Sequence, residues 1–255
     1  MRHPVPEVAS IRDFYAFEQH VATCRRHRGL EMVPQWYEVP VFYFSNPGGV
    51  VHHEAEVWAP RGSDALDYEL ELACVIGRLV RDLPDDDGAL DAGAGFTIMN
   101  DWSARDLQRV EMAVGLGPSK GKDFATSLGP ELVTFDELAD CYRDGRLHLE
   151  MTAAVNGRLL SRGNSGSMYW TWPRLLAHAS RDTVLRPGDV LGSGTVGSGC
   201  ILELTPEVAG GWLKPGDLVE LTIERLGTLR NRVIRHPLAD DMKRPGRISD
   251  ASLSA

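Results

Sequence analysis

The chain has 255 residues, of which 43% are hydrophobic, so it can bury a sizeable core and is not expected to be disordered. Its formal net charge is −9 and its pI is about 5.4, which disfavours general binding to nucleic acid or to an anionic membrane, because both are polyanions. No apolar run approaches the ~20 residues of a membrane span, and the first residues lack the apolar segment of a secretory signal. We therefore expect a cytoplasmic protein without nucleic-acid or membrane partners.

The first half of the chain is expected to mix helices and strands. Apolar residues recur at helical spacing over residues 11–30, which predicts a helix. Residues 39–44 are apolar and aromatic and precede a Pro-Gly-Gly turn, which is typical of a short strand. Residues 67–76 alternate between apolar and acidic side chains, which predicts another strand. A short apolar strand is expected at 95–99 and a helix at 104–112.

The second half is more plainly β. Residues 147–155 alternate, and the following Asn156-Gly157 is a strong hairpin signal. Two Pro-Gly-Asp turns, at 186–189 and 214–217, each precede an apolar segment that is expected to form a strand. The one clear helix predicted in this half covers residues 170–180. The pattern indicates an α+β chain that is mainly antiparallel β.

The domain organisation is expected to be simple. We predict a single catalytic domain over residues 1–255, with a core at about 11–235 and a loosely held tail at 236–255, which is rich in Asp, Arg, Pro and Ser. The four cysteines are far apart and form no C-x-x-C pair, so buried free thiols are expected rather than disulfides or a structural zinc site.

Acidic residues provide the first chemical signal. Period two places Glu69 and Glu71 on one face of a strand, which on its own is more typical of a solvated face than of a ligand site. Asp101 ends an apolar strand, where side chains often meet a ligand, and Asp13 is a further candidate. Three or more hard oxygen ligands suit Mg²⁺, Ca²⁺ or Mn²⁺ better than Zn²⁺. Spacing alone cannot bring these residues together.

A set of motifs in this sequence resembles the fumarylacetoacetate hydrolase family. The segments that carry the resemblance are Asp13-Phe14-Tyr15 with Gln19-His20, the Glu-x-Glu of residues 69–71, the run from Asn100 to Gln108, Gly117-Pro118 with Gly121-Lys122-Asp123-Phe124, Gly192-Ser193-Gly194-Thr195, and Leu202-Glu203-Leu204. They occur in the family's order over residues 13–230. The resemblance implies a mixed β-sandwich roll with a few peripheral helices, usually assembled as a homodimer.

The resemblance also implies the site. A divalent metal, Mg²⁺ or else Mn²⁺ or Ca²⁺, would be held by Asp13, Glu69, Glu71 and Asp101, with Thr126 beside it. The catalytic residues would be His20 as general base, Glu203 to orient it, and Lys122 next to the metal. The substrate would be contacted by Tyr15, Arg105, Gln108 and Thr195.

The activity implied is hydrolysis of a carbon–carbon bond in a small β-diketo acid or acylpyruvate. An isomerase, hydratase or oxaloacetate-type decarboxylase on the same scaffold is the alternative, and a non-catalytic binding protein stapled by the metal is a further one. The chain departs from the family pattern at Met112, where the fumarylacetoacetate enzyme has a tyrosine. The substrate-binding arginine of the fumarylacetoacetate enzyme has three possible counterparts in this chain, Arg25, Arg26 and Arg28. The identity of the oxo-acid therefore stays open.

One further motif is rejected. Residues 192–197 fit the G-x-G-x-x-G of a dinucleotide site, which requires a helix to follow. Residues 200–204 are instead expected to form a strand, so the glycines are better explained by a close approach of backbone to a ligand.

Overall fold

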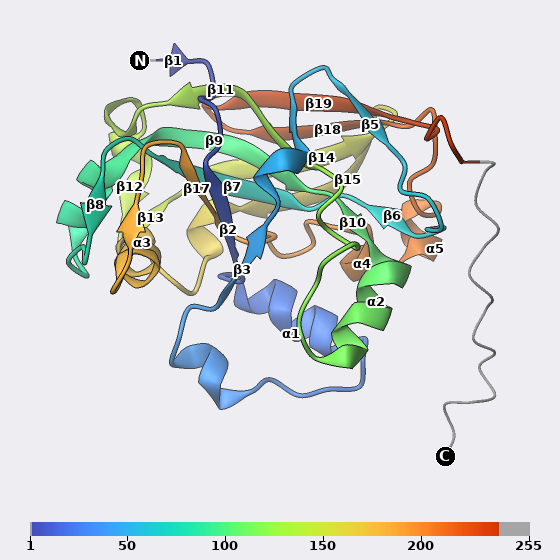
Figure 1. The fold of residues 1–255 in the computed structure, drawn as a ribbon, viewed down its shortest axis with the longest axis horizontal. Coiled ribbons are helices and arrows are strands. Elements are labelled where there is room, and N and C mark those ends of the chain that lie inside the picture. The colour runs from blue at the N-terminus through green and yellow to red at the C-terminus, as the bar shows by residue number, and fades with distance from the viewer. Residues whose placement is uncertain (1, 240–255) are drawn as a thin grey trace.

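The computed structural model describes residues 2–239, and its strands form two large sheets that pack face to face (Figure 1). Across the larger, eight-stranded sheet of this described part the order is β1 (Arg2–His3), β11 (Thr126–Val133), β9 (Gly93–Asp101), β7 (Leu70–Ile76), β17 (Asp189–Gly192), β2 (Ser10–Phe14) and β3 (Phe42–Ser45), with β4 (Val50–His52) paired to β11. Across the smaller sheet it is β15 (Arg158–Asn164), β14 (Glu150–Val155), β18 (Leu218–Ile223), β19 (Gly227–Ile234) and β5 (Glu56–Trp58).

Shorter elements surround the two sheets. Two-stranded ribbons join β6 (Leu66–Asp67) to β10 (Ser103–Ala104), β8 (Val80–Arg81) to β16 (Val184–Leu185), and β12 (Tyr142–Arg143) to β13 (Arg146–Leu147). The α-helices are α1 (Glu18–Arg26), α2 (Arg105–Val114), α3 (Trp172–Ser180), α4 (Ile201–Leu204) and α5 (Pro206–Ala209). The 3₁₀ turns are η1 (Pro34–Tyr37), η2 (Pro47–Gly49), η3 (Asp87–Ala92), η4 (Phe135–Glu137), η5 (Ala139–Cys141) and η6 (Ser165–Ser167). In the part of the chain that is described, no helix has the length and apolar character needed to span a bilayer.

The core lies between the two sheets. Strand β11 packs against β19, and β9 packs against both β18 and β19. Leu72 and Ile98 from the larger sheet and Leu221 and Ile223 from the smaller one are buried in the same apolar cluster. Burial of an aliphatic side chain contributes about 1.5–3 kcal/mol, so this shared face stabilises both sheets at once. The expected class, mainly β with a few peripheral helices, is confirmed.

The helix predicted over residues 11–30 is wrong in its first third. Ser10–Phe14 forms strand β2, which lies between β17 and β3, and α1 begins only at Glu18. Residues 11–14 are all buried in this position, so pairing on both sides outweighs the helical spacing. Phe14 enters the core from strand β2 and Phe17 from the residue before α1, which produced the apparent periodicity.

The strand predicted at residues 200–204 is also wrong, because Ile201–Leu204 is helix α4. A strand after the glycines therefore cannot exclude a dinucleotide site, but the strand topology does exclude one. Helix α4 has four residues, and β17 before it pairs in parallel with β2, which precedes it in the chain. A dinucleotide site needs a strand, a full helix and a second parallel strand, and β18, the next strand of a large sheet, belongs to the other sheet.

Other predictions from the sequence are confirmed. The helix at 104–112 is α2, and the helix at 170–180 is α3, although α4 and α5 show that α3 is not the only helix of this half. The Asn156-Gly157 hairpin joins β14 to β15 with φ of 52° and 77°. All four thiols are free, but Cys141 is only partly buried. Of the predicted tail, residues 240–255 lie outside the described part.

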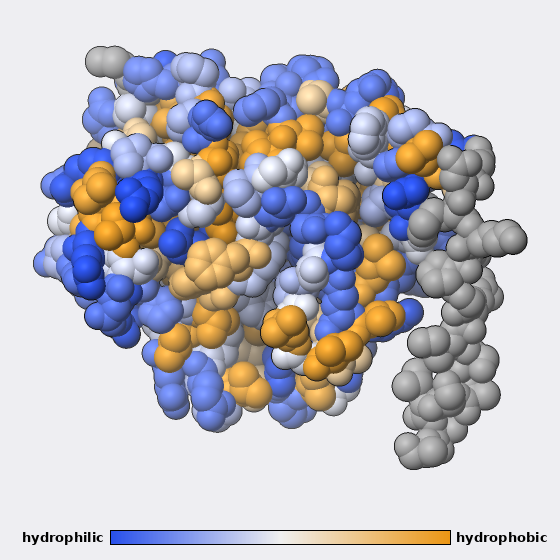
Figure 2. Space-filling model, viewed as in Figure 1, coloured by the Kyte–Doolittle hydropathy of each residue, from blue (hydrophilic) through white to orange (hydrophobic). Residues whose placement is uncertain are grey.

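The helices that carry or adjoin the candidate site residues lie together at one side of the sheets. Helices α1 and α2 occupy the lower side of Figure 1, and α1 contacts α4. Apolar side chains are exposed along α2 and just after it, at Val110, Met112, Val114 and Leu116, and Figure 2 shows apolar surface on this part of the molecule. Met112, the position that departs from the family pattern, is 42% exposed.

Candidate active site

Four carboxylates converge where strands of the larger sheet run side by side. Asp13 is carried by β2, Glu71 by β7 and Asp101 by the last position of β9, while Glu69 directly precedes β7. Each offers an oxygen within 4.8 Å of the others, and all four residues are buried. The solvated-face explanation of Glu69 and Glu71 is therefore excluded, since they are only 5% and 0% exposed.

A glycine keeps space open for this acidic cluster. Strand β17 runs between β7 and β2, and its last residue, Gly192, pairs with Asp13 on one side and Ala73 on the other. A Cβ at Gly192 would lie 2.5 Å from Oδ1 of Asp13 and 2.4 Å from Cε of Met99. Any side chain there would collide with the cluster, so glycine is required by close approach rather than by a turn.

Three oxygens of the cluster are buried without a hydrogen-bond partner: Oδ1 of Asp13, Oε2 of Glu71 and Oδ1 of Asp101. Buried polar atoms are usually satisfied, because an unpaired one costs about 1–3 kcal/mol. Unpaired oxygens that converge from separate strands suit a hard cation, which takes carboxylate ligands. The residues present therefore fit a divalent metal of the Mg²⁺, Mn²⁺ or Ca²⁺ type.

Two cations and a phenol already contact the cluster. Nζ of Lys122 donates to Oε2 of Glu69 and to Oδ2 of Asp101, both at 2.6 Å. Arg105 donates to the other oxygen of Glu69 at 2.7 Å. The hydroxyl of Tyr43 donates to Asp101 at 2.6 Å. These donors satisfy Glu69 on both oxygens but leave Asp13 and Glu71 without a cationic partner.

The pKa values of Asp13, Glu71 and Glu69 differ according to whether the carboxyl group has a cationic partner. Burial, reinforced by the charge of Asp101, raises the pKa of Asp13 well above its usual value. Burial and the charge of Asp13 do the same to the pKa of Glu71. At Glu69 burial acts in the same direction, but Lys122 and Arg105 outweigh it, so its pKa lies below the usual range. Asp13 and Glu71 are thus the pair that a bound cation would stabilise most.

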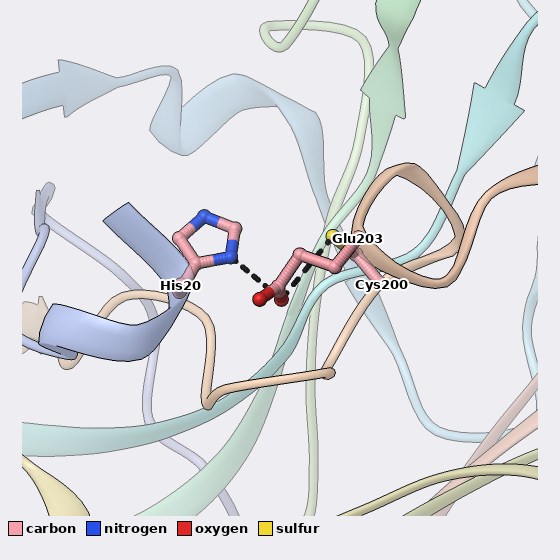
Figure 3. A group of neighbouring side chains, drawn as sticks. All are labelled: His20, Cys200 and Glu203. Carbon is pink, nitrogen blue, oxygen red and sulfur yellow. Dashed lines mark hydrogen bonds and ion pairs between the residues drawn. The ribbon is translucent and has the colours of Figure 1, made fainter. Parts of the chain in front are cut away.

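A histidine–carboxylate pair lies beside the cluster. Nδ1 of His20, on α1, is 2.8 Å from Oε2 of Glu203, on α4, and both side chains are almost fully buried (Figure 3). His20 is close enough to lower the pKa of Glu69 by its charge. Burial lowers the pKa of His20, but hydrogen bonds to Cys200 and Glu203 outweigh this and raise it to about 10. Glu203 therefore fixes the ring and stabilises its protonated form.

The remaining residues predicted for the site lie around these two groups. The ring of Tyr15 packs edge-on against His20, with ring centroids 5.4 Å apart. Oγ1 of Thr195 donates to Oε1 of Glu71 at 3.3 Å. Gln108 accepts a hydrogen bond from Arg105 at 3.0 Å. Thr126 pairs with Asp101 across β11 and β9. The structure brings all of them to one place, and their contacts with substrate stay predictions.

Arg105 has a structural task that the sequence did not suggest. Besides Glu69 it binds Asp67, whose carboxylate also accepts the backbone N–H groups of Ile201 and Leu202 at the start of α4. Asp67 thereby links the acidic cluster to the helix that carries Glu203. A signal for Asp67 was present, because period two places it on the same strand face as Glu69 and Glu71. Tyr43 carried no such signal, since its contact with Asp101 depends on the pairing of β2 with β3.

We expect Arg105→Met to destabilise the protein strongly. The substitution leaves Asp67 and Glu69 as buried carboxylates without this partner, and breaking a buried ion pair costs about 3–5 kcal/mol. Urea denaturation would measure the free energy of unfolding. The matched control is Arg162→Met, which removes an exposed pair with Glu150 and should change stability little. Equal effects of the two substitutions would contradict the role given to Arg105.

Known proteins resemble this chain over most of its length. The family model described as fumarylacetoacetate (FAA) hydrolase C-terminal matches residues 9–234. Fumarylacetoacetase of Arabidopsis thaliana is 32% identical over 248 residues, covering 78% of this chain and 58% of that protein. Mitochondrial oxaloacetate tautomerase FAHD2A of Homo sapiens is 33% identical over 195 residues, covering 76% and 59%. The crystal structure of 5-carboxymethyl-2-hydroxymuconate delta-isomerase from Mycobacterium smegmatis matches with a TM-score of 0.70 and 29% identity, covering 92% of this chain and 80% of that one.

These relatives agree on the scaffold but differ in activity. The chain spans only 58% and 63% of the fumarylacetoacetases of Arabidopsis thaliana and Oryza sativa. The family match nevertheless covers most of the chain and includes every predicted site residue, from Asp13 to Glu203. Relatives include a hydrolase, a tautomerase and an isomerase. The chain belongs to the fumarylacetoacetate hydrolase family of enzymes.

Proposed function

We propose that the protein is a divalent-metal-dependent hydrolase that cleaves a carbon–carbon bond next to a ketone in a small β-diketo acid or acylpyruvate. One observation carries this proposal: the 2.8 Å hydrogen bond between His20 and Glu203, buried beside four converging carboxylates. A histidine oriented by a carboxylate suits activation of water, and a cluster of carboxylates suits a hard cation. Hydrolysis of a β-diketone needs both.

The metal would be Mg²⁺ or Mn²⁺, held by Asp13, Glu69, Glu71 and Asp101. When bound, it would polarise a substrate carbonyl and stabilise negative charge that develops on oxygen. Lys122 lies in the same cluster and would add a fixed positive charge toward that oxygen.

His20 would perform the proton transfers. Its Nδ1–H donates to Glu203, which leaves Nε2 free to take a proton from a water molecule. The water oxygen attacks the ketone, the bond to the neighbouring methylene carbon breaks, and that carbon takes up a proton. The products are a carboxylic acid and a shorter oxo-acid, which together contain the substrate and one water. Tyr15, Arg105, Gln108 and Thr195 surround this space and are proposed to position the substrate.

An isomerase or tautomerase is the second candidate, and one observation favours it. The pKa of His20 is raised to about 10, where burial opposes and hydrogen bonds to Cys200 and Glu203 prevail. At neutral pH the metal-free site therefore holds an imidazolium, which donates a proton rather than accepting one. A residue that donates and retrieves a proton without attack by water would isomerise an oxo-acid. Relatives named as a tautomerase and an isomerase are consistent with this possibility.

A substrate panel tests whether the site acts on this class of compound. Acylpyruvates, other 2,4-diketo acids and oxaloacetate would be incubated with the protein, with Mg²⁺ or Mn²⁺ and with a chelator. We expect metal-dependent loss of the ultraviolet absorption of the enol for at least one diketo acid, because the four carboxylates need a cation to operate. Turnover that persists unchanged in chelator would contradict the metal-dependent mechanism.

A further inference from the structure

A second group of potential metal ligands lies beside the acidic cluster. Oε2 of Glu203 is 2.8 Å from Nδ1 of His20 and 3.7 Å from Sγ of Cys200 (Figure 3). One nitrogen, one sulfur and one oxygen thus lie within 4.8 Å of one another. We propose that His20, Cys200 and Glu203 form a separate site for a thiophilic divalent cation such as Zn²⁺, and that a cation bound there withdraws His20 from catalysis.

The ligand types separate this site from the acidic cluster. Zn²⁺ takes cysteine sulfur, histidine nitrogen and carboxylate oxygen, whereas Mg²⁺ prefers oxygen alone. Atoms bound to a tetrahedral Zn²⁺ at 2.0–2.3 Å lie roughly 3.3–3.8 Å apart. The 3.7 Å between Cys200 and Glu203 already falls in this range. Only the hydrogen-bonded His20–Glu203 pair, at 2.8 Å, must open by about half an ångström to admit the ion.

Charge balance is compatible with burial of the ion. An imidazolium, a carboxylate and a thiol together carry no net charge. Zn²⁺ bound by a neutral imidazole, a carboxylate and a thiolate also carries none, because the ion replaces two protons. Uptake of Zn²⁺ therefore adds no net charge to a buried cluster, which avoids the large desolvation cost of an uncompensated ion.

The surroundings supply a further ligand and a short path to solvent. Sγ of Cys24, one turn after His20 on α1, lies 3.7 and 3.8 Å from the two ring nitrogens and could approach a bound ion by side-chain rotation. Residues 202–205 of α4 and its end are only partly buried, so the group lies just beneath the surface. Sequence spacing could not reveal this site, because His20 and Cys200 meet only when α1 packs against α4.

Cobalt spectroscopy tests the site independently of enzymatic activity. Co²⁺ bound to a thiolate in tetrahedral geometry gives sulfur-to-metal charge-transfer absorption and strong visible bands, whereas Co²⁺ bound by carboxylates in octahedral geometry gives weak bands alone. We expect the metal-free wild-type protein titrated with Co²⁺ to develop the thiolate bands, and Zn²⁺ to displace them. Cys200→Ser should abolish these bands, and Cys141→Ser, which changes a thiol outside the His20, Cys200 and Glu203 group, should preserve them.

Further variants guard against misfolding and separate this inference from the proposed function. Calorimetric binding of Mg²⁺ to Cys200→Ser should be retained, which shows that the fold and the acidic cluster are intact. Glu203→Gln should weaken Zn²⁺ binding at least about tenfold. Glu71→Gln should keep the thiolate bands, because Glu71 belongs to the other site. Thiolate bands that are absent from the wild type, or unchanged in Cys200→Ser, would overturn the site.

Only the inhibitory consequence rests on the proposed function. Zn²⁺ should suppress turnover of the Mg²⁺-loaded enzyme. Turnover that is unaffected by Zn²⁺ when the thiolate site is fully occupied would refute the inhibition but not the site.

Discussion

Replacing His20 by alanine is expected to slow hydrolysis of a diketo acid by about 10²–10⁴, the usual contribution of a positioned general base. The imidazole is the group at this site that is oriented by a buried carboxylate, at 2.8 Å, so its loss leaves water without an acceptor for its proton. Metal binding should persist, because none of the four converging carboxylates is altered. The measurement is kcat/KM for wild type and variant, with binding of Mg²⁺ and of oxalate by calorimetry as the check on the site.

The pH dependence of this effect distinguishes catalysis from a structural role. A base works when deprotonated, so kcat/KM should rise with pH, and the midpoint should lie above the ordinary histidine value of about 6.5. Burial lowers the pKa of His20, but Cys200 and Glu203 raise it to about 10 in the metal-free protein. Glu203→Gln should therefore move the midpoint to lower pH. His52→Ala, at an exposed position, is the control and should leave the profile unchanged. Cleavage that survives His20→Ala within about threefold would remove this residue from the mechanism.

The second large effect is expected for Glu71→Gln, which keeps the shape of the side chain and removes one charge. Oε2 of Glu71 is buried without a partner, so in the metal-bound site it is expected to coordinate the cation directly. Loss of a ligand should weaken Mg²⁺ binding by at least the roughly 10–100-fold that loss of an outer partner costs. Turnover at limiting Mg²⁺ should fall with it. Glu56→Gln, on the exposed part of β5, is the matched control.

The same variant should stabilise the metal-free protein, with a defined pH dependence. Burial and the charge of Asp13 raise the pKa of Glu71. A carboxyl group with a raised folded-state pKa contributes its stability in full below its unfolded value, about 4.3, and loses it as pH rises through the folded value. The melting temperature of Glu71→Gln should therefore exceed that of wild type by a margin that grows as the pH rises above about 5. Saturating Mg²⁺ should reverse the order, because it stabilises wild type more. A margin that is independent of pH would contradict a buried Glu71 carboxyl group whose pKa is raised.

The sequence could identify residues whose neighbours lie close by in the chain. Period two brought Glu69 and Glu71 together as candidates, although the strand predicted at 67–76 is divided into β6 and β7 and Glu69 lies between them. Helix α2, which follows Asp101 within a few residues, was predicted correctly. Motif resemblance then supplied the partners that spacing could not, such as Asp13 and Glu203. In the structure, strands β2, β7 and β9 bring the four carboxylates together, and helix α4 places Glu203 next to His20.

The errors arose where tertiary contacts outweigh local pattern. Ser10–Phe14 follows a helical spacing but forms β2, because β17 and β3 pair with it on both sides. Ile201–Leu204 has the composition of a strand but forms α4, because Asp67 accepts two N–H groups at its start. Asp67 lies more than a hundred residues earlier in the chain, so no window around α4 contains the cause.

The identity of the products tests most directly whether this site adds water across a carbon–carbon bond. The diketo acid consumed fastest in the presence of Mg²⁺ would be incubated in water labelled with heavy oxygen, and the products analysed by mass spectrometry. Hydrolysis predicts two shorter acids whose masses together equal substrate plus one water, with labelled oxygen in the new carboxylate. A product of unchanged mass would instead establish isomerisation or tautomerisation, and loss of carbon dioxide would establish decarboxylation; either result would contradict the proposed hydrolase.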